Sequence, residues 1–507
     1  VDIDPLDTDG SLTLLRQFLD ESRWASEHRA VHELAQLCDG LPLALSLVGA
    51  RLATRPQRRV SREVNDLRSE RRRLTALSRD EEFSVQAVFD VSYQVLAPQL
   101  ARLYRVCALH PGPHFGVDAI AAAVREPAED TEDHLDKLAE THLLIEIGDQ
   151  RYRFHDLVRL HAHGQADRYD DLGARDEATR RMIEWYLDTA VSADLLVHPL
   201  RDRLGSRYHH DQPPTELFHD ERDALVWLES ERVNLFAALR AANDRRLDDL
   251  VWQFCEALWG WFLHYRHYDE WINVHTLGIA AARHADNRLA EARLHSQLGY
   301  AYVKIGRYGD AVDENTIALG LAQTEGDEAT EATALSQLGR AATCTGDLDA
   351  ALDYYIKARD LQAELGIVRG VGLCQRDIGE VLIKRGRYEE ATRALSDSLT
   401  VMRELADWTQ YARALRFLAI VHTERGQPKT AVATLTEALE LMRDKGSPYY
   451  QADLLYQLGE TMAGMGDAMP ARGYLTQARD LYAEIGDPIA QVIQARLADL
   501  DQSATGA

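Results

Sequence analysis

Histidines are the residues of this chain whose spacing comes nearest to a metal or catalytic site. His155, His161 and His163 stand at i, i+6 and i+8 of one segment, and His209 and His210 are adjacent. Zinc ligands on a helix lie at i and i+4, because that spacing places two imidazoles on one face. The first three histidines do not share a face in this way, so we interpret them as packing and surface residues. Local spacing indicates no metal site and no Ser-His-Asp or Cys-His arrangement.

Phosphate-binding loops are also absent from the 507 residues. The pattern G-x-x-x-x-G-K-[S/T], whose backbone N–H groups cradle phosphates, does not occur, and no apolar strand ends in the acidic pair of a Walker B motif. The sequence therefore predicts no catalytic residue and no tight nucleotide binding. We expect that this chain by itself is not an enzyme.

Charge and cysteine content restrict the classes of partner. The 57 Lys and Arg residues against 82 Asp and Glu residues leave a net charge of −25, which disfavours a protein that coats nucleic acid or an anionic membrane. The cysteines are odd in number and scattered, as in a reduced cytosolic protein (Cys38, Cys107, Cys255, Cys344, Cys374). No apolar run approaches the roughly 18 residues of a membrane span. We expect a cytoplasmic protein of several domains with no membrane partner.

Self-similarity at a spacing of 40 residues is the strongest pattern in the sequence. It is carried by the pairs Leu298-Gly299, Leu338-Gly339, Ile378-Gly379, Leu418-Ala419 and Leu458-Gly459, by the turn glycines Gly306, Gly346, Gly386, Gly426 and Gly466, and by the alanines Ala311, Ala351, Ala391, Ala431 and Ala471. A degenerate earlier copy fits the same grid at Leu258-Trp259 and Arg266. Apolar residues at helical spacing predict two amphipathic helices in each copy, with the glycine ending the first helix.

These copies resemble the tetratricopeptide repeat. The pattern is met best at Leu338, Gly339, Gly346, Leu348, Ala351, Tyr355 and Ala358. We predict an α-solenoid of six repeats of about 40 residues over 251–486, with a capping helix and tail over 487–507. The usual period is 34, so longer helices are expected here.

The resemblance implies a concave groove lined by the first helix of each repeat. Its expected groove-facing residues are Lys304, Arg340, Arg376, Lys384, Arg416, Tyr300 and Tyr456, together with Glu380. Most of them are basic in a protein of net negative charge, so we hypothesise that the groove binds an acidic peptide, a protein or another anionic ligand. The alternative is that these charges are ordinary solvated helix faces.

The first 75 residues are helical in pattern. Helices are expected over 11–24 and 27–38, and Gly40-Leu41-Pro42-Leu43-Ala44 opens an apolar helix through Leu52, with proline in the first turn. The short piece 1–4 alternates like the end of a strand. An arginine-rich stretch at 51–73 could contact nucleic acid, but its interspersed Glu63, Asp66 and Glu70 favour a surface helix with ion pairs.

Residues 76–165 predict a winged helix. Helices are expected over 83–96, 98–108, 117–125 and 129–142, followed by strands at 143–147 and 151–154 that Gly148-Asp149-Gln150 joins as a hairpin. A further helix runs to about Tyr169, and 166–250 is expected to be a helical linker. The segment 129–142 would be the recognition helix of a DNA reader, but six acidic residues against Lys137 alone speak against that role.

The order of these elements resembles the C-terminal part of the NB-ARC group of STAND-type signal-transduction ATPases. Gly-Leu-Pro-Leu-Ala, a winged helix, Phe154-His155-Asp156 and tetratricopeptide repeats follow one another, as in bacterial relatives similar to SARP-type transcriptional regulators. The His-Asp pair matches the end of the family's Met-His-Asp motif, with Phe154 in place of methionine. The resemblance implies that Pro42 packs on the adenine and that His155 reaches the β-phosphate of bound ADP, which would latch a closed state.

The chain departs from that family in lacking the phosphate-binding motifs. Because it also starts at Val1 in mid-pattern, we expect a fragment whose nucleotide-binding domain lies upstream, with ADP or ATP as cofactor of the longer protein only. By analogy with that family, we therefore interpret it as the sensor and relay portion of a nucleotide-switched transcriptional regulator that contacts DNA only through another domain. The alternatives are a free-standing repeat scaffold and a winged-helix DNA-binding protein.

Overall fold

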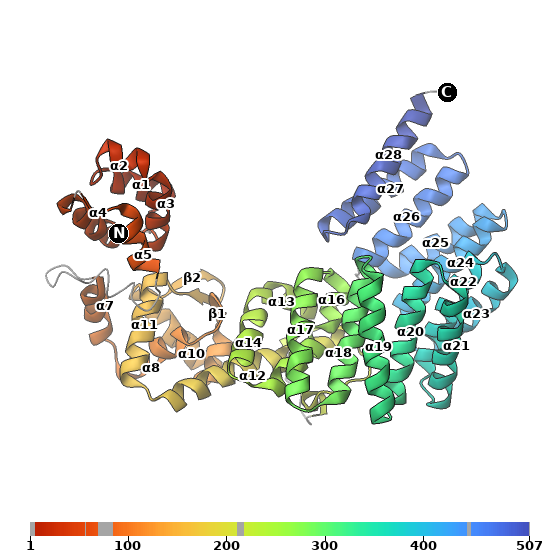
Figure 1. Ribbon diagram of the computed structural model, residues 1–507, viewed down its shortest axis with the longest axis horizontal. Helices are drawn as coiled ribbons and strands as arrows, with labels where there is room; N and C mark the ends of the chain where they lie inside the picture. The colour runs from red at the N-terminus through yellow and green to blue at the C-terminus, as the bar shows by residue number, and fades with distance from the viewer. Residues whose placement is uncertain (1–5, 56, 69–84, 210–216, 444–447, 506–507) are drawn as a thin grey trace. The chain divides into compact units, whose positions relative to one another are not determined.

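The chain is mainly α-helical with one small sheet (Figure 1). A computed structural model describes residues 6–505, except 56, 69–84, 210–216 and 444–447. It divides into two compact units, one formed by Val1–Tyr186 with Glu231–Ala241 and the other by Leu187–Ser230 with Ala242–Ala507. The division falls inside one long helix, α12 (Leu172–Val197), whereas the sequence predicted boundaries near residues 165 and 250. Among the described helices, none combines the length and apolarity needed to cross a bilayer.

The first unit begins with five helices around a small core. They are α1 (Thr8–Arg16), α2 (Glu21–Ser26), α3 (His28–Leu37), α4 (Pro42–Thr54) and α5 (Val60–Arg68). The prediction of one helix over 11–24 was wrong, because Asp20 caps a new helix there by accepting a hydrogen bond from the Arg23 N–H. The predicted strand at residues 1–4 lies outside the described residues.

Glu63 on α5 is the centre of the ion pairs that the sequence predicted for the arginine-rich stretch. Its carboxylate lies 2.7 Å from Arg51 Nη1 and 2.6 Å from Arg58 Nε, and its side chain is fully buried. The prediction of a surface helix was therefore incomplete, because this carboxylate is in the core. Asp66 and Glu70 lie outside the described side chains. Arg68, by contrast, pairs with Glu33 in a largely exposed position.

The middle of the first unit combines helices with a three-stranded sheet. Its elements are α7 (Val85–Gln94), α8 (Pro98–Ala108), β1 (His114–Gly116), α9 (Val117–Val124), α10 (Ala128–Glu140), β2 (Ile145–Gly148) and β3 (Arg151–Arg153). The strands are antiparallel in the order β1-β3-β2. The predicted hairpin is present as β2 and β3, but β1 was missed, since three residues after Pro111-Gly112-Pro113 are too short to show alternation.

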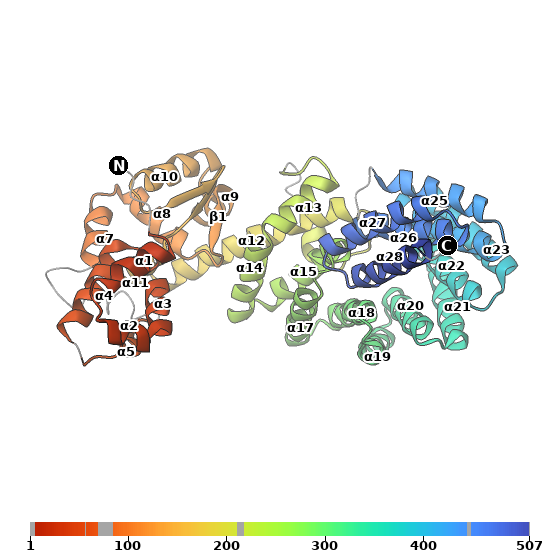
Figure 2. The same ribbon diagram turned by 90° about the horizontal axis from the view of Figure 1, so that it is seen from above.

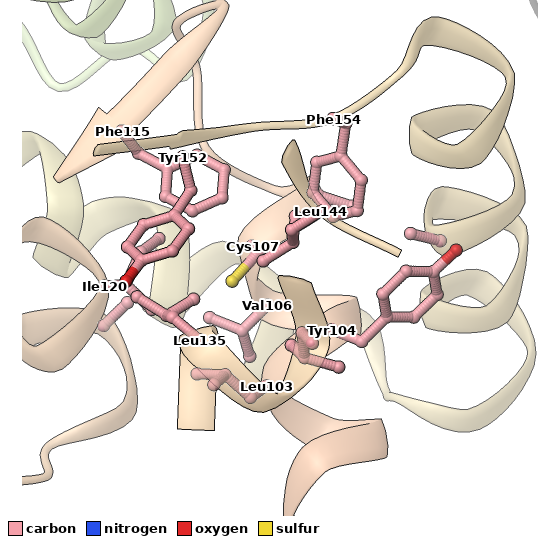
Figure 3. Close-up of a cluster of buried hydrophobic side chains, with 14 of the residues drawn as sticks. Leu103, Tyr104, Val106, Cys107, Phe115, Ile120, Leu135, Leu144, Tyr152 and Phe154 are labelled. Atoms are coloured by element: carbon pink, nitrogen blue, oxygen red, sulfur yellow. The ribbon is translucent and has the colours of Figure 1, made fainter. Parts of the chain in front are cut away.

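The core under this sheet is apolar and aromatic (Figure 3). Phe154 packs edge-on against Tyr104 and near Phe115, and all three side chains are buried. The residue that stands in place of the family's methionine is thus a core residue. Holding Phe154 in the core fixes the backbone at the start of α11 (Asp156–Tyr169), directly beside His155.

Helices connect this region to the repeats. A short 3-10 turn at Ser206–His209 comes first. It is followed by α13 (Glu221–Ser230), α14 (Arg232–Asp244), α15 (Asp248–Ala257), α16 (Trp259–Tyr265) and α17 (Tyr268–His284). Helix α14 belongs in large part to the first unit. The predicted helical linker is therefore not a separate body.

The second unit consists of helix pairs at the predicted spacing of 40 residues (Figure 2). They are α18 (Arg288–Lys304) with α19 (Tyr308–Glu325), α20 (Glu328–Thr345) with α21 (Leu348–Glu364), α22 (Val368–Lys384) with α23 (Tyr388–Glu404), α24 (Trp408–Glu424) with α25 (Pro428–Arg443), and α26 (Pro448–Gly464) with α27 (Ala468–Glu484). Helix α28 (Ile489–Thr505) packs on α27. The predicted turn glycines Gly306, Gly346, Gly386, Gly426 and Gly466 all have positive φ.

Candidate functional site

His155 is held by Asp39, a residue 116 positions away in the chain. Its Nε2 lies 2.6 Å from the main-chain oxygen of Asp39. Its Nδ1 lies 3.0 Å from Asp39 Oδ2, within ion-pair range but without the alignment of a hydrogen bond. The same carboxylate accepts a hydrogen bond of 3.1 Å from the Asp156 N–H. Asp39 therefore joins the first helical region to the His-Asp pair through both its backbone and its side chain.

The chain around Asp39 is tightly constrained. Asp39 and Gly40 both have positive φ, of 51° and 71°, and a Cβ on Gly40 would stand 2.3 Å from the backbone oxygen of Leu6. Only glycine fits such a turn. Pro42 follows as the first residue of α4 and is half-buried. The Gly-Leu-Pro turn thus brings Asp39 against His155.

A pocket of about 320 Å³ opens beside this contact. His155, Arg153, Asp39 and Gly40 are part of its lining, and Pro42 is not. The two residues that the resemblance assigned to nucleotide are 113 positions apart in the chain, and they do not line one cavity. An anionic group in this pocket would face His155 and Arg153. It would compete with the Asp39 carboxylate for the His155 imidazole.

The other histidines match their interpretation as packing residues where the structure describes them. His161 is 1% exposed, and its ring nitrogens lie 2.9 Å from Tyr104 Oη and 3.0 Å from Asp90 Oδ1. His163 is half-buried. Across the described residues, no group of three His, Cys, Asp or Glu side chains is placed to hold a metal ion.

A second pocket, of about 400 Å³, lies within the second unit between repeat helices and residues 196–201. Tyr300, Arg340 and Arg376, three of the predicted groove residues, line it. Arg376 is 1% exposed and bonds Asp377 at 2.6 and 2.9 Å and the Gln410 side chain. Its charge is therefore largely satisfied inside the protein.

The remaining predicted groove residues are not part of the lining of this pocket. The Lys304 ammonium is 5.5 Å from the centre of the Tyr300 ring. Lys384 pairs with Glu380 at 3.3 Å and Arg416 with Asp453 at 3.0 Å. Tyr456, on α26, is half-buried.

Several pocket residues were missed by the sequence analysis. Arg413, Trp408, Trp259 and Tyr450 all line the pocket, and Arg266 lies behind its wall with its guanidinium 4.4 Å from the Tyr449 ring. Helix faces alone do not identify such residues, because the pocket depends on which repeats meet. One signal was available, since Arg266 occupies the grid position of the turn glycines and has a φ of 62°.

The electrostatic potential around Tyr300 is positive. Burial by itself would raise the pKa of the Tyr300 phenol, but Lys304, Arg266, Arg340 and Arg413 around it lower that pKa well below its ordinary value. Burial likewise opposes ionisation of Asp377, yet Arg376 and Arg340 hold the pKa of its carboxyl below the usual range. Asp377 is thus the shared counter-ion of two arginines.

Comparison with known proteins agrees with the repeat assignment. Two tetratricopeptide repeat family models match the chain, over residues 332–366 and 373–444. These ranges cover α20 to α21 and α22 to α25. The helix pairs from α20 to α25 are therefore similar to tetratricopeptide repeats.

Two relatives in actinomycetes carry the name regulatory protein AfsR. The protein of Streptomyces coelicolor is 37% identical over 260 residues, which are 50% of this chain and 26% of the relative. The protein of Streptomyces griseus is 30% identical over 330 residues, which are 63% of this chain and 33% of the relative. The matches thus span about a quarter to a third of these relatives.

One of the solved structures that resemble the chain matches it over nearly its whole length. It is a signal-transduction ATPase with numerous domains and a tetratricopeptide repeat sensor, from Pyrococcus horikoshii, with a TM-score of 0.40 and 13% identity over 98% of this chain and 75% of that chain. The chain is thus homologous to part of the regulatory proteins named AfsR, and its residues 332–366 and 373–444 match tetratricopeptide repeats.

Proposed function

We propose that this chain is the sensor and relay portion of a nucleotide-switched regulator, and that the longer protein controls transcription. The homology to regulatory protein AfsR carries this proposal. The repeats would bind the signal, which we take to be a peptide, a protein or another anionic ligand. The region before them would pass the signal to a nucleotide-binding domain that the 507 residues do not contain.

Asp39 and His155 are the proposed relay contact. When ADP is bound in the longer protein, His155 would donate to a phosphate oxygen and Pro42 would pack against the base. The described residues fit a phosphate group at the His155 end, because His155 and Arg153 line the adjoining pocket. Asp39, 3.0 Å from the imidazole, would take the place of that phosphate when the nucleotide site is separated from His155.

DNA binding by the winged-helix segment is the weaker candidate. Helix α10 exposes acidic side chains, namely Glu129, Asp130, Asp133, Asp136 and Glu140, against the single Lys137. DNA phosphates would be repelled by that face. We therefore propose that contact with DNA is made by another domain.

Nucleotide retention in the longer protein tests the relay. His155→Ala should release bound ADP during purification, whereas His163→Ala on the same helix should retain it. The measurement is the nucleotide content of the purified protein by chromatography. Equal content in the two variants would contradict the proposed role of His155. The 507-residue chain alone should show neither ATP hydrolysis nor tight ADP binding by calorimetry.

A further inference from the structure

The pocket lies near a contact between the two ends of the repeat region. Helix α16 touches α26 within the second unit, and the Arg266 guanidinium stacks over the Tyr449 ring at this contact. The inner surface of the repeats here faces residues 196–201. The result is a pocket of about 400 Å³, which is in the range of small-molecule sites.

Cations outnumber carboxylates around the pocket. Its described lining has five arginines (Arg201, Arg340, Arg369, Arg376, Arg413) and two carboxylates (Glu221, Asp407). Arg201 pairs with Asp194 at 2.7 Å, and Arg369 pairs with Asp407 at 2.9 Å. Asp377, behind the wall, is shared by Arg340 and Arg376, so Arg413 is the lining arginine without an acidic partner among the described residues. Because burying uncompensated charge is costly, such a site favours an anion that carries more than one charge.

Arg413 is the lining arginine most available to a ligand. Its Nη1 bonds the neutral Gln410 side chain at 2.8 Å, and its guanidinium lies 5.2 Å from the centre of the Tyr450 ring. Among the described side chains, no carboxylate lies within ion-pair distance of it. A guanidinium held in place by a neutral partner can still offer a forked pair of N–H donors to an anion.

Arg266 adds a second cation without an acidic partner. It is 3% exposed, and its three guanidinium nitrogens have no hydrogen-bond partner among the described residues. Its neighbours are tyrosine rings, with Tyr449 at 4.4 Å and Tyr300 at 6.0 Å. The left-handed φ of 62° at a bulky residue adds backbone strain, and such combined costs are typical of functional positions.

Aromatic side chains complete the lining. Trp259, Trp408, Tyr300 and Tyr450 are all part of it. Ring faces beside cations suit a ligand that joins a flat apolar group to an anionic one. An acidic peptide would use the cations but has no need of the rings.

We propose that this pocket binds a small phosphate monoester that carries a flat ring, with Arg413 and Arg340 on the phosphate and Trp408 on the ring. The inference rests on the proposed sensor function and names the class of its signal. A dianionic phosphate compensates two cations and matches the guanidinium fork with three oxygens, whereas a carboxylate compensates one.

Calorimetry on the full 507-residue chain tests the proposal with phenyl phosphate as probe. Phenyl phosphate should bind at least about tenfold more tightly than benzoate, which has the same ring and one charge fewer. Arg413→Met should weaken phenyl phosphate about tenfold, as expected for the loss of one charged contact. Arg425→Met, a substitution of the same type at the exposed end of the same helix, should change nothing.

The ring is tested separately with inorganic phosphate. Trp408→Leu should weaken phenyl phosphate about tenfold and leave inorganic phosphate unchanged, because only the ester carries a ring. Circular dichroism and Arg413→Lys, which keeps the charge and should bind more tightly than Arg413→Met, separate lost binding from lost folding. Equal binding of benzoate and phenyl phosphate, or equal effects of Arg413→Met and Arg425→Met, would overturn the proposal.

A peptide of six glutamates distinguishes this inference from the proposed function itself. If the peptide binds in an Arg413-dependent manner and phenyl phosphate does not, the inference is wrong and the anion-sensing groove stands. If neither probe binds, both the inference and the anionic signal are wrong.

Discussion

The two units differ in how they neutralise their buried charges. In the first unit, Glu63 forms ion pairs with Arg51 and Arg58, and Asp39 lies within ion-pair distance of His155. In the second unit, the cations around Tyr300 exceed the carboxylates near them, and Arg266 and Arg413 have no described acidic partner within ion-pair distance. The paired charges of the first unit stabilise its fold. We infer that the unpaired cations of the second unit are neutralised by a bound anionic ligand.

This difference predicts opposite responses to mutation. Removing one member of a matched pair leaves an unpaired charge in the core and costs stability. Removing a buried cation that has no acidic partner should stabilise the unliganded protein but weaken ligand binding. Since the chain contains two units, local stability is best followed by hydrogen exchange of peptides within each unit rather than by one global transition.

Glu63→Ala should have the largest effect. The substitution leaves Arg51 and Arg58 without their acidic partner beside a buried cavity, so the opening free energy of α3 to α5 should fall by roughly 3–5 kcal/mol. Hydrogen exchange of peptides from these helices measures this. Glu33→Ala is the matched control, because it breaks an exposed Arg–Glu pair and should cost much less stability. Equal losses in the two variants would show that burial of the pair does not matter.

Arg266→Met should have the opposite sign. An apolar side chain of similar volume removes a buried cation, and after the loss of stacking on Tyr449 the opening free energy of α16 and α26 should rise by about 1 kcal/mol. Hydrogen exchange of these two helices checks the change, and Arg266→Lys, which keeps the charge, should give no gain. A loss as large as that of Glu63→Ala would break the contrast between the two units.

The repeat half was predictable because its pattern is local and recurs. Each copy contains a turn glycine, small residues between its helices and apolar residues at helical spacing. The observed helix pairs from α18 to α27 keep the predicted period. Helix boundaries in the first unit were also close, as at Pro98–Ala108. Proline and glycine mark such ends from sequence alone.

Contacts between distant segments were not predictable in the same way. Nothing local connects Asp39 with His155, and strand β1 is too short to show a period. The groove prediction found Tyr300, Arg340 and Arg376 from repeat positions. Arg413 and Trp408 share the pocket with residues 196–201, which lie more than 200 positions earlier in the chain. Single-sequence patterns predict elements, whereas closure depends on the small rotation between successive repeats.

Asp39→Asn should have a smaller effect than either core substitution. Asparagine tolerates the positive φ at this position, so the change removes the charge without adding strain. Because Asp39 is about a third exposed, the loss of the ion pair with His155 should lower the opening free energy at the start of α11 by roughly 0.5 kcal/mol. Hydrogen exchange of the first turn of α11 reports it.

Asp39→Ala provides the comparison for that variant. It also removes the acceptor for the Asp156 N–H and places a less tolerant residue at positive φ, so its loss should be larger. If Asp39→Asn loses nothing, the carboxylate and His155 are not an effective pair, and the first unit is less well matched in charge than the contrast requires.

The ionisation of Tyr300 should give the smallest signal, since it is one phenol among 20 tyrosines. Burial would raise its pKa, but Lys304, Arg266 and Arg340 lower it well below 10, so Tyr300 should lose its proton before an ordinary tyrosine as pH rises. The difference in near-ultraviolet phenolate absorbance between the wild-type chain and Tyr300→Phe isolates this titration. In the Arg266→Met background the midpoint should move up, because one of the cations that favour the phenolate is gone. A wild-type midpoint above 10 would mean that burial outweighs the cations, and the second unit would then not hold the excess positive charge that distinguishes it from the first.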